Sequence, residues 1–216
     1  MMKERKPNRL KGYDYSSDNI YFVTSCVQNR VCCFGNIVGT GRDPSRHSVE
    51  FASSVGKGRD LSLQQNGDLS LQQNGDLSIQ MILNEWGTIA EKQWHWLCEQ
   101  YPYVVLHAFV VMPNHIHGII EINRSRIKSS DPIKIKSLSE LIGAYKTTVS
   151  KQIHLLDRTD RSRPVPTQHG PVPSFRWQRS FHEHIIRDEK TFKTISDYIL
   201  NNPARWEQDK FYNYEQ

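Results

Sequence analysis

The chain of 216 residues carries a net charge of +5 and has a sequence pI of about 9.0. This length suits one sizeable domain, or one domain with a large insertion. We find no signal peptide and no apolar run long enough to cross a membrane, so we expect a cytoplasmic protein without a membrane partner. The mildly basic balance favours a polyanionic partner without requiring one.

The first half of the chain predicts one strand and one helix. Residues Ile20 to Val27 are rich in β-branched and aromatic side chains, which is typical of a strand. Residues Asn84 to Glu99 carry apolar side chains at helical spacing, which predicts an amphipathic helix. The four cysteines form no Cys-x-x-Cys pair, which disfavours a structural zinc site and favours free thiols: Cys26, Cys32, Cys33 and Cys98.

The segment between this strand and this helix interrupts the globular pattern. Asp60 to Gly67 recurs as Asp68 to Gly75, and a partial copy begins at Asp76. A unit of this size at so few copies is too small to build a repeat domain. Its glycine and polar content is typical of a flexible loop. We therefore predict a disordered, repeat-containing insertion over residues 38–79.

A pair of histidines lies in the most apolar part of the chain. Residues 104–122 predict two strands that are joined at a Pro113-Asn114 turn, and His115 and His117 open the second strand. Side chains two residues apart on a strand point to one face, roughly 6.6 Å apart along it. Two imidazoles on one face can bind one cation or one phosphate. The alternative is a pair of core histidines with buried hydrogen-bond partners.

The second half predicts a helix, a loop and a strand. Ser137 and Glu140 match a capping box, and the helix that they open runs to about Leu155. Residues 157–173 are rich in Arg, Pro and Gly and indicate a loop. Residues 177–186 alternate apolar and polar side chains, which predicts a strand. We expect its His182-Glu183-His184 segment to face the surface or DNA.

A final helix precedes Pro203, which ends it. Tyr198 and Asn202 are four residues apart and therefore neighbours on one helix face. The alternative is a core tyrosine beside a helix-capping asparagine. The residue before a proline is biased away from helical geometry, so Asn202 can sit half outside the helix.

Together these segments resemble a known family. Met112-Pro113-Asn114-His115-Ile116-His117 resembles the HUH motif (histidine, hydrophobic residue, histidine) of single-tyrosine transposases, and Tyr198 to Pro203 resembles their tyrosine helix. Residues 177–189 resemble the segment that leads into that helix. Residues 9–15, with 21–24, are similar to the opening of the REP-associated tyrosine transposases. The resemblance covers about 1–37, 80–123 and 135–207.

The resemblance implies a single HUH transposase domain over 1–216 that acts in DNA transposition and recombination as a metal-dependent single-stranded DNA endonuclease. Tyr198 would be the catalytic nucleophile that forms a covalent 5′-phosphotyrosine. His115, His117 and Asn202 would be the metal ligands, with Mg or Mn as the ion. The order of the elements itself fits an α+β fold, a ferredoxin-like antiparallel sheet backed by helices and interrupted by the long flexible insertion.

Single-stranded or hairpin DNA is the expected partner, bound by a monomer or a homodimer. Two other functions remain open from the residues. One is a domesticated nucleic-acid-binding protein without cleavage activity, and the other is a non-nuclease metal-dependent phosphoesterase. Basic side chains can neutralise phosphates by counterion release. The candidate DNA-binding residues are Arg9, Lys11, Lys146, Arg176, Arg179 and Arg187.

Overall fold

A four-stranded antiparallel sheet forms the centre of the computed structural model, which describes residues 10, 12–39, 79–127, 133–159 and 174–212. The strand order is β4-β5-β1-β6, so the strand with the histidine pair lies inside the sheet. The strands are β1 (Asn19–Cys26), β4 (Val104–Met112), β5 (His115–Ile122) and β6 (His182–Ile186).

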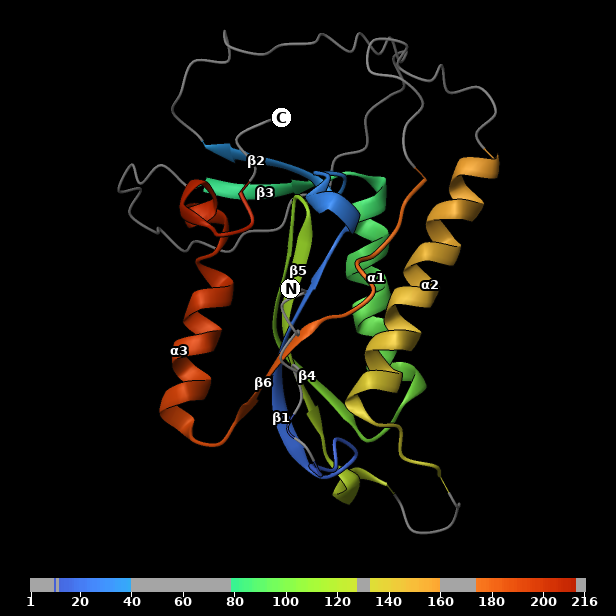
Figure 1. The fold of residues 1–216 in the computed structure, drawn as a ribbon, viewed down its shortest axis with the longest axis vertical. Coiled ribbons are helices and arrows are strands. Elements are labelled where there is room, and N and C mark those ends of the chain that lie inside the picture. The colour runs from blue at the N-terminus through green and yellow to red at the C-terminus, as the bar shows by residue number, and fades with distance from the viewer. Residues whose placement is uncertain (1–9, 11, 40–78, 128–132, 160–173, 213–216) are drawn as a thin grey trace, which may run out of the picture.

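Helices cover both faces of this sheet, as Figure 1 shows. Helices α1 (Glu85–Gln100) and α2 (Leu138–Thr159) lie on one face, and α3 (Glu189–Leu200) lies on the other. The main core fills the space between the sheet and the first two helices, and Trp94 and Tyr145 are fully buried there. The order β1-α1-β4-β5-α2-β6 with this strand order is a ferredoxin-like arrangement, as the sequence predicts.

Side-chain caps fix the beginnings of the three helices. The Asn84 side chain accepts a hydrogen bond from the Gly87 N–H, and the Asp188 side chain accepts one from Thr191. Ser137 and Glu140 form the reciprocal contacts of a capping box, as predicted. These bonds satisfy N–H groups that have no partner inside the helix. The caps thus set where α3 begins, and so where Tyr198 lies along it.

A short hairpin differs from the sequence prediction. Strand β2 (Gly35–Gly39) pairs with β3 (Ile79–Leu83), so residues 38, 39 and 79 are paired strand rather than the ends of a disordered insertion. Gly35 has φ 137°, and a Cβ there would lie 2.1 Å from the Ile82 carbonyl oxygen, so only glycine suits this close approach. The rest of the predicted insertion, 40–78, lies outside the described residues.

Two element boundaries also differ. Strand β6 begins at His182 rather than at Trp177, which makes only an isolated bridge with Val27. The carbonyls of Gln178 and Ser180 accept hydrogen bonds from Lys146 and not from a neighbouring strand, which accounts for the shorter ladder. Helix α2 continues past Leu155 to Thr159. Within the described part of the chain, no helix has the length and hydropathy of a membrane span.

Candidate active site

His115 and His117 meet on the face of the sheet that α3 covers. Both are almost completely buried, with 0% and 1% of their surface exposed. Their Nε2 atoms lie 3.1 Å apart, because alternate residues of β5 point to the same face. Two ring nitrogens therefore converge on one point, as the sequence pattern predicts.

The Asn114 side chain fixes the tautomer of His115. Its amide nitrogen donates to the carbonyl oxygens of Arg30 (3.1 Å) and Phe211 (2.9 Å), so its own oxygen faces His115. That oxygen lies 2.8 Å from Nδ1 of His115. An amide oxygen only accepts, so Nδ1 of His115 must carry the proton. The Nε2 lone pair of His115 is consequently available to a cation.

Thr24 orients the His117 ring without fixing its tautomer. Its hydroxyl lies 2.8 Å from Nδ1 of His117. Two Nε2 lone pairs 3.1 Å apart would repel each other, so with no ion bound His117 would carry its proton on Nε2 and donate it to His115. A hydroxyl both donates and accepts, so Thr24 also suits the other tautomer, in which both Nε2 lone pairs converge.

Burial keeps both rings neutral. It lowers the pKa of His115 to about 3, with further lowering from the positive charges of Lys210 and Arg30. Burial lowers the pKa of His117 as well, and His115 adds to the effect. Metal ligation requires neutral imidazole, so neither ring has to lose a proton at neutral pH.

Tyr198 reaches this pair from α3. Phe192, Ile195 and Ile199 pack this helix onto the sheet, and Tyr198 lies beside them at the edge of the apolar stripe. Its hydroxyl is 3.2 Å from Nε2 of His117 and 3.4 Å from Oδ2 of Asp209. Burial and the negative charge of Asp209 raise the pKa of Tyr198. The hydroxyl is therefore protonated at neutral pH and needs activation to act as a nucleophile.

The chain just after α3 completes the polar cluster. Asn202 lies outside the helix, is 2% exposed, and donates from Nδ2 to Oδ2 of Asp209 (3.3 Å). Its Oδ1 accepts no hydrogen bond from any residue that the structure describes. Ligand atoms of His115, His117 and Asp209 all lie within 4.8 Å of one another. Two imidazole nitrogens, a carboxylate and an unsatisfied buried carbonyl oxygen form a donor set that fits a divalent cation.

Asp209 is the site residue that the sequence does not predict. The 3₁₀ helix Pro203–Gln208 turns the chain back, so Asp209 meets Asn202 and Tyr198. The same segment covers the histidine pair, with the ring centroid of Phe211 4.7 Å and that of Trp206 5.9 Å from His115. No periodic spacing joins Asp209 to Tyr198, so only its acidic character marks it in the sequence.

The candidate DNA-binding residues differ in their exposure and contacts. Arg176, Arg179 and Arg187 are exposed, whereas Arg9 and Lys11 lie outside the described residues. Lys146 is half-buried, and its ammonium donates to the carbonyls of Gln178 and Ser180 at 2.9 Å each. It also lies over the rings of Trp177 and Phe181. Lys146 therefore holds the segment before β6 in place, a role that its helical position does not predict.

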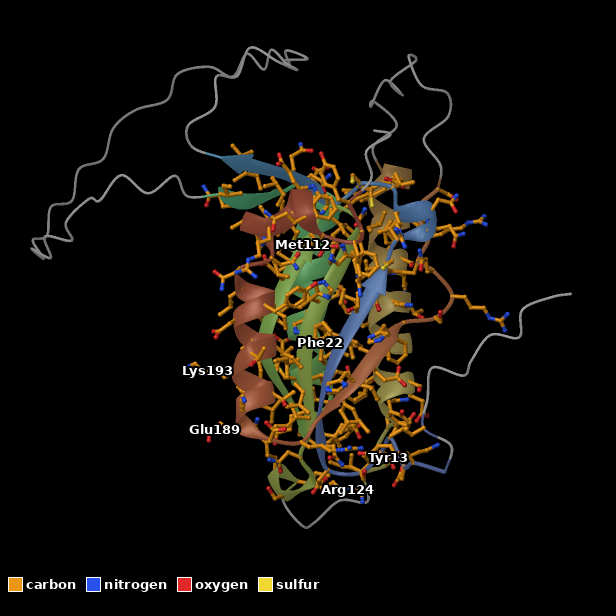
Figure 2. All side chains as sticks on the ribbon, turned by 60° about the vertical axis from the view of Figure 1, so that its left-hand side comes forward. Tyr13, Phe22, Met112, Arg124, Glu189 and Lys193 are labelled. Carbon is orange, nitrogen blue, oxygen red and sulfur yellow. The ribbon has the colours of Figure 1, made fainter. Side chains whose placement is uncertain are left out.

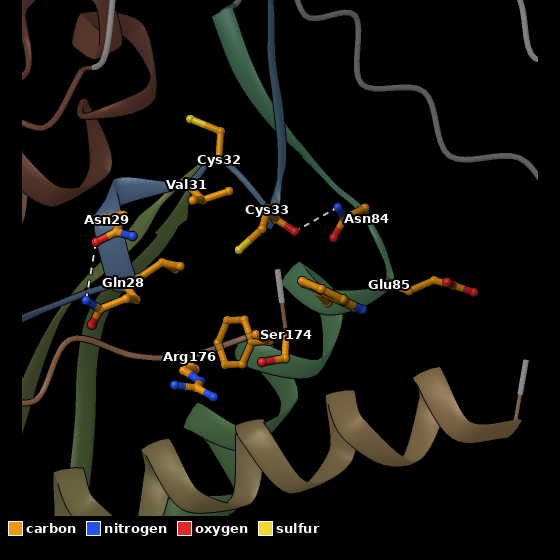
Figure 3. A pocket seen from close by; sticks show the side chains of 12 residues that line it. Gln28, Asn29, Val31, Cys32, Cys33, Asn84, Glu85, Ser174 and Arg176 are labelled. Atoms are coloured by element: carbon orange, nitrogen blue, oxygen red, sulfur yellow. Dashed lines mark hydrogen bonds between the residues drawn. The ribbon is translucent and has the colours of Figure 1, made fainter. Parts of the chain in front are cut away.

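A cavity of about 790 Å³ lies apart from these residues (Figure 3). Its lining includes Cys32, Cys33, Trp86 and Arg176, and none of the residues of the histidine–tyrosine cluster. Burial, with a smaller effect of Cys32, raises the pKa of the Cys33 thiol to about 12, so this thiol is not a nucleophile at neutral pH. The cavity therefore brings no thiolate nucleophile from Cys33 beside the candidate cluster.

Comparisons with known proteins find relatives by sequence. No family model matches the chain. An uncharacterized protein of Haemophilus influenzae is 31% identical over 210 residues, which are 96% of this chain and 93% of that protein. A second Haemophilus influenzae protein, named "Putative REP-associated tyrosine transposase", is 30% identical over 108 residues. This match covers 50% of the chain and about half of the named relative, 53% of its length.

Two solved structures are more distant. One is described as the structure of a REP-associated tyrosine transposase bound to a REP hairpin; the match has 17% identity, covers 97% of this chain and 77% of the other, and has a TM-score of 0.45. The second is a putative transposase of Deinococcus radiodurans. The match has 14% identity, covers 93% of this chain and 97% of the other, and has a TM-score of 0.38.

The ferredoxin-like sheet, with a histidine pair on an inner strand and a tyrosine on the last helix, has the layout expected of an HUH protein with a single tyrosine. The chain belongs to one family with the first Haemophilus influenzae protein. Its resemblance to the REP-associated tyrosine transposases, expected from its motifs, is confirmed by the second.

Proposed function

We propose that this protein is a transposase that cuts and rejoins single-stranded DNA in a metal-dependent reaction. The observation that carries the proposal is the 3.2 Å approach of the Tyr198 hydroxyl to Nε2 of His117. A nucleophile and a charge-stabilising site must both reach one phosphate, and here they come together from α3 and β5. The similarity to a putative REP-associated tyrosine transposase supports the same function.

In the proposed reaction the Tyr198 oxygen attacks a phosphodiester. An O–P bond forms to the tyrosine, the bond from phosphorus to the 3′ oxygen breaks, and the upstream strand leaves with a 3′-hydroxyl. The downstream strand stays attached as a 5′-phosphotyrosine. Because one phosphoester replaces another, a 3′-hydroxyl can attack this adduct and rejoin DNA without ATP.

Four residues would hold the divalent cation. They are the His115 and His117 rings, the Asp209 carboxylate and the buried oxygen of Asn202. Mg or Mn is the proposed ion, and the two imidazoles suit Mn better. When bound, the cation would neutralise charge that develops on the phosphate. Asn114 and Thr24 hold the two rings so that their Nε2 atoms face it.

The proposed substrate is single-stranded DNA beside a hairpin. Exposed Arg176, Arg179 and Arg187 supply positive charge for its phosphates. We propose that 1–216 acts as a single domain. Since Tyr198 and both histidines come from one chain, a monomer would carry the whole centre. A homodimer is not required for this chemistry.

A denaturing gel tests the proposal. The protein would be mixed with Mn²⁺ and with single-stranded hairpin DNA copied from the flanks of its own gene, beside a Tyr198→Phe variant. We expect a slow covalent protein–DNA band from the unaltered protein only. A hairpin shift on a native gel without any covalent band would instead support DNA binding without cleavage.

A further inference from the structure

A row of three polar side chains crosses the sheet at the histidine pair. Thr24 on β1 is paired with His117 on β5 and with His182 on β6. Directly opposed residues of antiparallel strands point to the same face. The 2.8 Å contact of Thr24 with His117 fixes which face this is. His182 therefore lies on the same face as the proposed metal ligands, whereas Glu183 next to it is buried on the opposite face, which α1 and α2 cover.

This part of the face is open. Helix α3 packs mainly over β4 and less over β5 and β6, and Figure 2 shows β1 to one side of it. His182 is exposed, and the positive charges of Lys210 and His184 lie close enough to influence it. Adjacent strands are about 4.8 Å apart, so His182 sits roughly two strand spacings from His117. One phosphate group fits between two imidazoles at this separation.

The direction from which Tyr198 approaches indicates which oxygen of the phosphodiester would lie beside His182. Tyr198 starts on α3, crosses β5 and meets Phe22 of β1, with ring centroids 6.3 Å apart. In an in-line displacement the attacking and leaving oxygens lie on opposite sides of phosphorus. Attack from the side of β4 and β5 therefore places the leaving 3′ oxygen toward β1 and β6, where His182 lies.

We propose that His182 is a catalytic residue that protonates the leaving 3′ oxygen during cleavage. This inference rests on the proposed function. As the Tyr198 oxygen bonds to phosphorus and releases its proton to water, the bond to the 3′ oxygen breaks and the His182 imidazolium gives that oxygen a proton. In rejoining, neutral His182 takes the proton back from the 3′-hydroxyl.

The surroundings of His182 suit both cleavage and rejoining. Burial, Lys210 and His184 lower the pKa of His182, so the free ring is neutral and able to accept a proton. The negative charge of a bound phosphodiester favours the protonated ring, which is the form needed for cleavage. His184 lies one row further along the same strand and face, opposite Phe22, and provides a matched control.

A sulfur substitution at the leaving atom separates proton donation from any structural role. The cleavage position would first be mapped with the unaltered protein and Mn²⁺. The same hairpin oligonucleotide would then be made with sulfur in place of the bridging 3′ oxygen. A thiolate is a far better leaving group than an alkoxide and needs no proton. Covalent adduct would be timed on both substrates for the unaltered protein, His182→Ala, His182→Gln and His184→Ala.

We expect both His182 variants to lose about 100-fold or more in rate on the oxygen substrate. On the sulfur substrate they should come within about tenfold of the unaltered protein. His184→Ala should stay within a few-fold on both, and hairpin shifts on native gels should be equal for all. An equal loss on both substrates, or no loss on either, overturns the inference alone. Absence of any Tyr198-dependent adduct from the unaltered protein overturns the proposed function, and the inference with it.

Discussion

The hydroxyl of Tyr198 lies 3.2 Å from Nε2 of His117, although 81 residues separate the two in the chain. The helix that carries Tyr198 is held by a small apolar cluster that includes Ile199 and Ile119, and His117 belongs to an inner strand. Both positions are therefore fixed by packing and not by a mobile loop. Such rigid placement is what an in-line attack on a phosphate needs.

Asp209 should be a metal ligand. Replacing it with Asn removes the one carboxylate among the proposed ligands, so we expect the affinity for Mn²⁺ to fall at least tenfold. Isothermal titration of the purified variant would measure this. Glu207→Gln removes an exposed carboxylate from the same 3₁₀ helix and is the matched control. Equal affinities of the two variants would exclude Asp209.

Thr24 should orient His117. Thr24→Val keeps the shape of the side chain but removes the hydroxyl that contacts Nδ1, so the ring loses the hydrogen bond that orients it. Loss of such a supporting contact typically costs 10- to 100-fold in metal affinity. Mn²⁺ titration would measure the loss, with Thr147→Val on the exposed face of α2 as the control. Unchanged affinity in Thr24→Val would show that His117 is positioned without Thr24.

The contrast between these residues shows what the sequence can and cannot predict. The spacing of His115 and His117 follows from strand alternation, and the position of Tyr198 follows from helix periodicity. Asn202 reaches the site from just past the end of α3. Thr24 contacts a histidine 93 residues away, and Asp209 reaches the site through an irregular turn. Neither contact has a local period, so only the folded chain reveals it.

The elements of the fold also divide into those that the sequence predicts and those that it does not. Apolar periods, with the capping box of Ser137 and Glu140, predict α1, α2 and the β4–β5 hairpin close to their observed bounds, and they place α3 before Pro203. The β2–β3 hairpin was missed because its short strands adjoin the repeats and include two glycines. Lys146 was expected to bind DNA, but its ammonium donates to two backbone carbonyls instead.

Phe211 should slow metal exchange, because its ring covers the histidine pair. Phe211→Ala opens this cover and leaves the backbone carbonyl that binds Asn114. We expect Mn²⁺ to dissociate several-fold faster after addition of a chelator, which stopped-flow measurement would detect. Leu200→Ala, an exposed apolar position at the end of α3, should keep the original rate. An unchanged rate in Phe211→Ala would mean that the ion leaves by another route.

Lys146 should make the free energy of unfolding change with pH in the alkaline range. Burial lowers its pKa from 10.5 to about 8. Between these values the unfolded chain holds the proton and the folded chain does not, so stability rises with pH across the window. After allowance for partial exposure we expect Lys146 to contribute about 1 to 2 kcal/mol of added stability between pH 8 and 10.5. The raised thiol pKa of Cys33 acts in the opposite direction in this range, so the effect of Lys146 is the difference between variants.

Urea unfolding of the unaltered protein and of Lys146→Met across this window measures the effect. Between pH 8 and 10.5 Lys146→Met should lose about this contribution relative to the unaltered protein, whatever its stability at pH 8. Lys151→Met, at an exposed position of the same helix, should follow the unaltered protein. Parallel curves for the unaltered protein and Lys146→Met would contradict the assignment.

The identity of the covalently modified residue tests the central claim most directly. The adduct formed on single-stranded hairpin DNA would be digested with protease and nuclease, and the modified peptide sequenced by mass spectrometry. We expect the nucleotide phosphate on Tyr198. A phosphate on another residue, such as Tyr212 nearby, or cleaved DNA without any protein adduct, would contradict the proposed mechanism.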